Sequence, residues 1–113
     1  MCDGGEPPLD QAETCREFHF DKIQTRREDA ERLNVPLIIT EFGACSNSMS
    51  CFSEISGACD AFDDSLASWA HWQYKGFGDF TTTGNSNEGL YDNSGNVQDN
   101  KLRALTRTYV HAF

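Results

Sequence analysis

Glu41 is the residue whose type and position most favour catalysis. It follows the apolar residues 37–40 and precedes Phe42 and Gly43, which puts a carboxylate at the carboxyl end of an expected buried strand. A carboxylate half shielded from water needs hydrogen bonds or a cation to stay ionised. A catalytic nucleophile is kept ionised by such partners. The alternative is that Glu41 belongs to a structural ion pair at the end of the strand.

Two further side chains could bind a ligand near Glu41. Trp72 occupies the matching place on an expected second strand, where its indole could stack on a sugar ring or simply pack in the core. Lys75 could donate to a sugar hydroxyl or pair with Glu41, although a solvated lysine is the common case at a strand end. Trp69 is expected to pack in the core. His71 alternates with Trp72, so we expect it on the opposite face in a structural role.

Other kinds of site have little support in the sequence. His19 and His111 have no acidic or cysteine partner at the spacing of metal ligands. Asp60, Asp63 and Asp64 lack the spacing of an EF-hand calcium loop, so a solvated helix face is expected there. The phosphate-binding glycine motifs and the G-x-S-x-G elbow are absent. We therefore expect neither a metal nor a cofactor.

An alternation of helices and strands would position these side chains. Apolar residues at helical spacing predict helices, β-rich and aromatic-rich runs predict strands, and Pro36 ends the first helix. Ser50 or Ser53 is expected as the N-cap of the second helix. The expected order is helix 11–34, strand 37–40, helix 52–66, strand 67–75, loop 76–100 and a closing amphipathic helix 101–113, with Lys101 away from the apolar face of Leu102, Leu105, Tyr109 and Phe113.

These elements indicate an α/β fold that is incomplete. The unbroken apolar run at residues 37–40 is typical of a parallel strand covered on both faces. Two such strands cannot make a sheet alone, because each needs neighbours at its edges and helices on its faces. A (β/α)8 TIM barrel takes about 250 residues, so a chain of 113 residues could supply about a quarter of its strands. We expect an incomplete TIM barrel fragment.

Charge and hydropathy argue against two classes of partner. The 18 acidic and 9 basic residues give a net charge of -9, which repels nucleic-acid phosphates and anionic lipids. The longest apolar run, residues 35–39, is far shorter than the roughly 20 residues of a membrane span. Met1 is followed by acidic residues rather than by the basic and apolar regions of a signal peptide. Neither a nucleic-acid partner nor a membrane span is expected.

The cysteines are odd in number and many for a cytosolic chain of this size. None of them forms the C-x-x-C pair of a zinc ribbon. A disulfide is the first interpretation, free thiols the second and a metal site the third, and at least one thiol must stay unpaired or bond outside the chain. The five are Cys2, Cys15, Cys45, Cys51 and Cys59.

Two segments resemble glycoside hydrolase family 5, and in particular its endoglycoceramidase-like members. Residues 36–45, PLIITEFGAC, resemble the seventh barrel strand of that family, and residues 68–75, SWAHWQYK, resemble the eighth. The tail is similar to the run that ends the barrel, at residues 89–92, Gly95 and residues 105–109. The resemblance covers most of residues 29–113. It implies that residues 11–113 are the C-terminal portion of a glycoside hydrolase barrel, with its last two strands and their helices. Residues 1–10 hold glycines and prolines among acidic residues, and we expect them to be a disordered or cut edge.

The resemblance also implies roles for the three candidate residues. Glu41 would be the catalytic nucleophile, Trp72 the sugar-stacking platform, and Lys75 a residue near the glycan. The implied reaction is retaining hydrolysis of a glycan or glycolipid, with glycosphingolipid as the first expectation. It needs a second carboxylate about 5–5.5 Å away, which protonates the leaving oxygen and then activates water.

In the family this acid/base residue comes from the fourth strand, behind an Asn, and residues 1–40 contain no Asn-Glu pair. We therefore expect an enzyme fragment that is inactive alone and needs the upstream barrel strands of the same parent chain. The full-length parent would be extracellular or lysosome-like. The alternative is a non-catalytic carbohydrate-binding or truncated product that lacks the acid/base residue.

Overall fold

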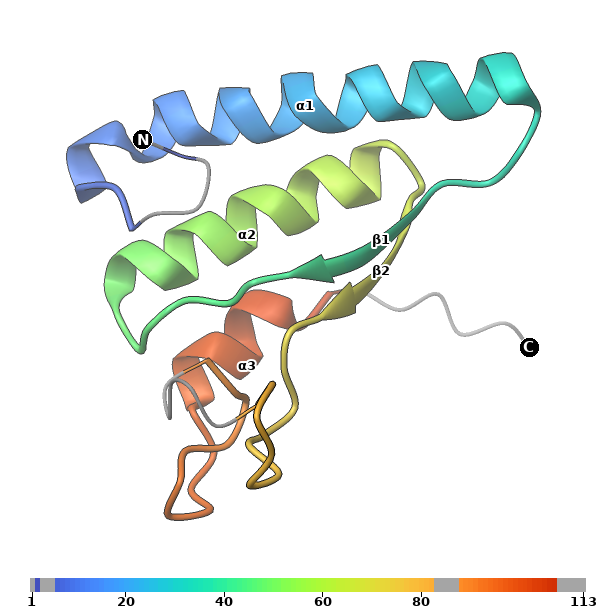
Figure 1. Ribbon diagram of the computed structural model, residues 1–113. Coiled ribbons are helices and arrows are strands. Elements are labelled where there is room, and N and C mark those ends of the chain that lie inside the picture. Colours follow the sequence, from blue (N-terminus) through green and yellow to red (C-terminus); the bar gives the residue numbers. More distant parts are fainter. Residues whose placement is uncertain (1, 3–5, 83–87, 108–113) are drawn as a thin grey trace, which may run out of the picture.

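The computed structural model describes residues 2, 6–82 and 88–107 (Figure 1). Its elements in chain order are a 3-10 turn at Leu9–Gln11, α1 at Ala12–Leu33, β1 at Ile38–Phe42, α2 at Met49–Asp64, β2 at Ser68–His71 and α3 at Asp99–Leu105. The described residues thus form three α-helices and a small sheet of two parallel strands. This mixture fits part of an α/β fold, whereas the complete barrel stays a prediction.

α1 confirms the helix predicted over residues 11–34. It ends at Asn34, which adopts a left-handed conformation with φ 54° and donates its N–H to carbonyls of the last turn. Pro36 follows and cannot continue the helix. The apolar stripe that α1 buries consists of Cys15, Ile23 and Ala30.

α2 begins earlier than the sequence predicted. Ser48, rather than Ser50 or Ser53, is the N-cap, and its hydroxyl accepts a hydrogen bond from the Cys51 N–H at 3.1 Å. Cys51 is fully buried, so the first turn already belongs to the apolar face of the helix. Gly57 lies where α1 and α2 approach each other, because a Cβ there would be 3.7 Å from an α1 Cα atom.

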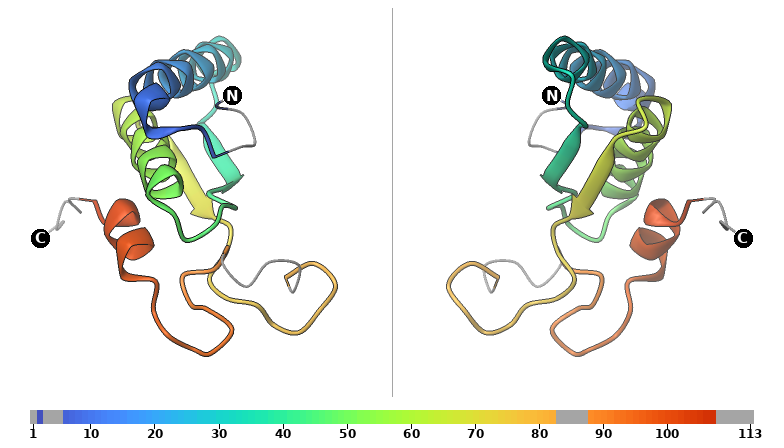
Figure 2. Two further views of the ribbon diagram at one scale, coloured as in Figure 1. Left: turned by 90° about the vertical axis from the view of Figure 1, so that its left-hand side faces the viewer. Right: turned by 90° about the vertical axis from the view of Figure 1, so that its right-hand side faces the viewer.

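The described helices lie on one face of the sheet (Figure 2). Ile38 pairs with Ser68, and Ile39 with Trp69. Ile39 and Trp69 pack against the core on the helical side, whereas Ile38 is 61% exposed. The prediction that residues 37–40 are covered on both faces is therefore wrong for the described part of the chain, because its helices cover a single face.

β2 is shorter than the strand predicted over residues 67–75. It ends at His71, and the Trp72 N–H then donates to the Phe42 carbonyl at 2.8 Å. A strand can extend only as far as its partner offers backbone groups, and β1 ends at Phe42. Trp72 therefore follows the strand, and Lys75 lies in the loop beyond it.

α3 differs most from its predicted helix over residues 101–113, because it ends at Leu105. Lys101, predicted to lie away from the apolar face, is fully buried, whereas Leu102 is 43% exposed. Helical periodicity assigns a lysine to the polar face because it cannot detect an acceptor elsewhere in the chain.

The described residues between β2 and α3 are irregular, as predicted for residues 76–100, apart from one antiparallel bridge between Tyr91 and Val97. Residues 83–87, Tyr109, His111 and Phe113 lie outside the described residues.

The core fills the space between the three helices and the sheet. Asp60 and Asp63 of α2 were expected on a solvated face, but both pair with Arg107, just past α3, and Asp60 also pairs with Arg16 of α1. Within the described residues, no helix is both long enough and apolar enough to cross a membrane. The buried cluster consists of Ile23, Cys51, Ile55, Ala58, Cys59, Ala61, Phe62 and Leu105.

Candidate active site

A cavity of about 800 Å³ lies beside β1. Its walls come from α1, β1, the loop after β1 and α2. Glu41 and Trp72 both line it, so the structure brings these two candidate residues to one cavity. Lys75 does not line it.

Glu41 is the fourth residue of the five in β1, and it is exposed. The half-shielded environment expected for it is therefore wrong. Its neighbour Phe42 packs on the helical side, with its ring centroid 4.8 Å from that of Phe62 and 5.3 Å from that of Trp69. In the part of the chain that the structure describes, Glu41 has neither a hydrogen bond nor an ion pair. Its carboxylate is thus available to a ligand, and the structural ion pair is not seen among these residues.

Trp72 and His71 lie in different surroundings. Trp72 is half-buried at the cavity, whereas His71 packs its ring against Phe42 and the Gly43 backbone. Burial, and then the charge of Lys101, lowers the pKa of His71 to about 4. Neither ring nitrogen of His71 has a hydrogen-bond partner among the described residues. These contacts favour the structural role expected for His71.

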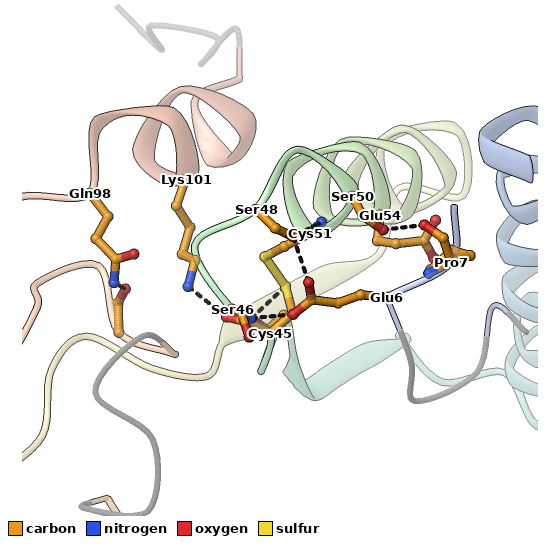
Figure 3. Close-up of a disulfide and its surroundings, with 12 residues drawn as sticks. Glu6, Pro7, Cys45, Ser46, Ser48, Ser50, Cys51, Glu54, Gln98 and Lys101 are labelled. Atoms are coloured by element: carbon orange, nitrogen blue, oxygen red, sulfur yellow. Dashed lines mark hydrogen bonds between the residues drawn. A yellow bond between two sulfur atoms is a disulfide. The ribbon is translucent and has the colours of Figure 1, made fainter. Parts of the chain in front are cut away.

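The loop after β1, residues 43–48, is packed tightly at its start. Gly43 has φ +87°, and a Cβ there would lie 2.6 Å from the His71 ring. Only glycine combines this backbone conformation with such a close approach. The disulfide between Cys45 and Cys51 then ties the loop to the first turn of α2 (Figure 3).

Two charged residues that the sequence did not single out also hold this loop. Glu6 accepts a hydrogen bond from the Ser46 N–H at 2.6 Å and one from the Ser48 hydroxyl at 2.5 Å. Lys101 donates from Nζ to the Cys45 carbonyl at 2.9 Å. Glu6 falls within residues 1–10, the expected disordered or cut edge. Nothing in the neighbouring sequence predicts these contacts, because Glu6 and Ser46 are 40 positions apart and Lys101 and Cys45 are 56 positions apart.

Further carboxylates line the same cavity, and each has a polar partner. Glu54 lies 2.8 Å from Nε2 of His19, so this histidine has an acidic partner that sequence spacing could not reveal. Glu6 binds the loop described above, and Glu88 also interacts with other groups. Among the described residues, no group of three histidine, cysteine or acidic side chains is arranged to hold a metal ion.

Lys75 lies on the exposed loop after β2. Its ammonium is 5.3 Å from the centroid of the Phe77 ring. Tyr74 and Tyr91 form an edge-to-face pair with centroids 5.1 Å apart, and Phe80 is fully exposed at the tip. A place for Lys75 near a glycan stays a prediction.

The cysteines confirm the disulfide interpretation. Cys2 pairs with Cys15, and Cys45 with Cys51. Cys59 is free and fully buried in α2, and burial raises the pKa of its thiol to about 11.

The chain is similar to a protein of Cyanea nozakii named endoglycoceramidase. The two are 29% identical over 98 residues, which cover 86% of this chain and 19% of that protein. No protein-family model matches the chain, and no solved structure matches it. The chain thus spans less than a fifth of this relative, and the likeness suggests a glycosidase-like fragment.

Proposed function

We propose that the chain is the part of a retaining glycoside hydrolase that carries the nucleophile. The enzyme would be of the family 5 type, with a (β/α)8 barrel, and would cleave O-glycosidic bonds in glycosphingolipid glycans. One observation carries the proposal: Glu41 and Trp72 lie at the carboxyl ends of paired parallel strands and line one cavity. Catalytic residues of such barrels occupy this end of the strands.

Glu41 suits the attacking role because its carboxylate is exposed and unpartnered among the described residues. In a retaining mechanism it would bond to the anomeric carbon while a second carboxylate protonates the leaving oxygen. We propose that this acid/base residue belongs to upstream strands of the parent chain. Trp72 would stack on the sugar, and Lys75 would donate to a glycan hydroxyl from the loop. The two disulfides fit an extracellular or lysosome-like parent.

Covalent labelling tests the nucleophile separately from the acid. The reagent is a β-lactosyl fluoride with a second fluorine in place of the ring hydroxyl next to the anomeric carbon. The Glu41 carboxylate would form the glycosyl ester as the carbon–fluorine bond breaks, and fluoride would leave with the bonding electrons without being protonated. The second fluorine disfavours the oxocarbenium-like transition state of hydrolysis, so the ester persists.

The expected result is one added fluorolactosyl group, a disaccharide, on the peptide that contains Glu41, found by mass spectrometry of the native polypeptide. Glu41→Gln should abolish it. Glu54→Gln is the matched control, because Glu54 lines the same cavity but is paired with His19. An adduct that survives in Glu41→Gln, or no adduct on the wild-type protein, would contradict the proposal.

The mass of the native polypeptide decides which protein to label. An antibody raised against residues 88–101 would detect it in source extract. A band several times heavier than 12.6 kDa identifies a complete hydrolase, and Glu41 should then be replaced in that parent. A band at 12.6 kDa would mean that a truncated product exists, and sugar binding rather than hydrolysis would then be the activity to test.

A second candidate function is carbohydrate binding without hydrolysis. The exposed aromatic side chains of Tyr74, Phe77 and Phe80, which follow Trp72 in the chain, favour it. Here lactose should quench tryptophan fluorescence in the wild type and not in Trp72→Ala, whereas no Glu41 adduct should form. Phe18→Ala is the control, because Phe18 is an aromatic residue of α1 that does not line the cavity.

A further inference from the structure

One peptide group in the loop after β1 is held at both ends by charged side chains. The Cys45 carbonyl accepts from the Lys101 ammonium at 2.9 Å, and the Ser46 N–H of the same peptide donates to Glu6 at 2.6 Å. Glu6 precedes α1, and Lys101 belongs to α3, so three distant parts of the chain meet at this peptide. Figure 3 shows the two side chains approaching the loop from different sides.

The charges match the polarity of the peptide. Its carbonyl and N–H point in opposite directions when the bond is trans, so each charge meets the end of opposite partial charge. Hydrogen bonds to ionised groups are about twice as strong as neutral ones. Burial lowers the pKa of Lys101, while Glu88 and Glu6 oppose that shift. The Ser48 hydrogen bond in turn lowers the pKa of Glu6. The attraction of Glu88 and Glu6 thus favours the charged form of Lys101, and the Ser48 hydrogen bond favours the charged form of Glu6.

The position of this peptide links it to the candidate nucleophile. Cys45 lies four residues after Glu41 and is also tied to Cys51 by the disulfide. Cys45, Ser46 and Glu6 line the cavity together with Glu41. The loop that follows β1 is therefore anchored at the wall of the cavity that Glu41 also lines.

We propose that Glu6 and Lys101 are positioning residues, which fix the Cys45–Ser46 peptide and thereby the alignment of Glu41 in the cavity. This inference rests on the proposed function, in which Glu41 attacks the sugar. In this proposal, neither Glu6 nor Lys101 contacts the sugar. Their loss should therefore slow the attack step and leave sugar binding at Trp72 unchanged, because small misplacements of a reacting group cost rate.

The labelling reaction provides the test. Two quantities are measured: its maximal rate, and the half-saturating concentration, at which the reagent gives half of that rate. Glu6→Ala should lower the maximal rate about tenfold, the factor expected for loss of a charge-assisted hydrogen bond. The half-saturating concentration should change less than about twofold. Glu6→Gln should recover most of the rate, because its amide oxygen can still accept from the Ser46 N–H. Lys101→Met should resemble Glu6→Ala.

Asp79→Ala is the matched control. Asp79 is also an exposed carboxylate that binds its own loop, but on the side of β2. It should leave the maximal rate of labelling unchanged. A rise in half-saturating concentration at constant maximal rate in Glu6→Ala would overturn the positioning role, and so would equal slowing by Asp79→Ala.

Hydrogen exchange at the Ser46 amide separates this inference from the proposed function. The amide should be protected in the wild type and should exchange faster in Glu6→Ala. Glu6 is exposed, so this variant keeps the test valid even where Lys101→Met does not fold. Equal exchange in wild type and Glu6→Ala overturns the inference whatever the labelling shows. A wild-type protein with a protected amide and no Glu41 adduct overturns the proposed function, and with it the positioning role.

Discussion

The loop after β1, residues 43–48, and the loop after β2, residues 72–82, are anchored differently. The first contacts the segment before α1, the first turn of α2 and the buried face of α3. The second is joined to distant residues at its start, where the Gln73 and Tyr74 carbonyls accept from the N–H groups of Leu90 and Tyr91. Its tip is held within itself, because Asp79 accepts hydrogen bonds from the backbone and hydroxyl groups of Thr81 and Thr82. Long-range contacts therefore order the loop beside Glu41, and local contacts order the tip of the loop beyond Trp72.

This difference fits two separate tasks. A nucleophile must be held close to its productive geometry, because small displacements reduce the rate. A loop that contacts sugars gains from adaptable side chains, and loops on a rigid scaffold commonly carry such contacts. In the proposed enzyme, the exposed aromatic side chains at Tyr74, Phe77 and Phe80 would serve the second task.

The largest contrast should come from one glycine in each loop. Gly43→Ala should cost about 3 kcal/mol, because a Cβ at φ +87° is strained and would also lie 2.6 Å from the His71 ring. Gly78→Ala has the strain alone, with φ +73° and no atom within 4 Å, and should cost about 1 kcal/mol. Urea unfolding followed by circular dichroism measures both. Equal losses would show that the first loop is no more tightly packed than the second.

The next largest effect should come from the disulfide of the first loop. Replacing Cys45 and Cys51 together by serine should cost about 2 kcal/mol, the loop-closure entropy of so short a ring. Amide exchange should accelerate in residues 43–48 and stay unchanged in residues 74–80. The control is Cys59→Ala in α2, which should destabilise the protein by leaving a small cavity without accelerating exchange in the first loop. Accelerated exchange in both loops would contradict separate anchoring.

The two loops should also respond to acid in different ranges. His71, beneath the first loop, has a pKa of about 4 in the folded chain against an ordinary 6.5. Between these values the unfolded chain binds more protons, so stability should fall as the pH drops from 6.5 towards 4. NMR titration of the His71 ring and urea midpoints would check this. His71→Gln should remove the slope, and a His71 midpoint near 6.5 would contradict it.

Asp79 governs the corresponding response of the second loop. The Thr81 and Thr82 hydrogen bonds hold its pKa below the ordinary 3.8. The stability it contributes is fully present above 3.8 and is lost as the pH falls through the lowered value. The hydrogen bonds of residues 79–82 should therefore persist while the pH falls from 6.5 towards 4 and His71 lowers the stability. Amide shifts of residues 79–82 that begin to change together with the loss of stability near 6.5 would indicate a single unit.

The smallest effect should come from the tip of the second loop. Phe80 is fully exposed, so Phe80→Ser should change the free energy of unfolding by less than about 0.5 kcal/mol. Urea unfolding is again the measurement. A loss above about 1 kcal/mol would show that this side chain is packed in solution and that the second loop is more ordered than its contacts indicate.

Sequence reasoning predicted the features that depend on neighbours along the chain. The period of α1 and the proline at position 36 place the first helix and the strand that carries Glu41. It could not predict that β2 stops at His71, because this depends on where its partner strand ends. Nor could it find Glu6 or Lys101, whose contacts join distant parts of the chain. Periodicity even placed Lys101 on the wrong face, since a buried lysine depends on an acceptor that the pattern does not contain.

The burial of Cys59 protects the pairing of the other cysteines. A chain with two disulfides and an odd thiol can shuffle its pairs, because a thiolate attacks a disulfide sulfur. Burial raises the pKa of Cys59 to about 11, so at neutral pH almost no thiolate is present, and no attacking reagent reaches its fully buried sulfur. The thiol becomes reactive only when α2 opens. Alkylation of Cys59 would therefore report each opening of the core, and scrambled disulfides would be a mark of chains that had unfolded.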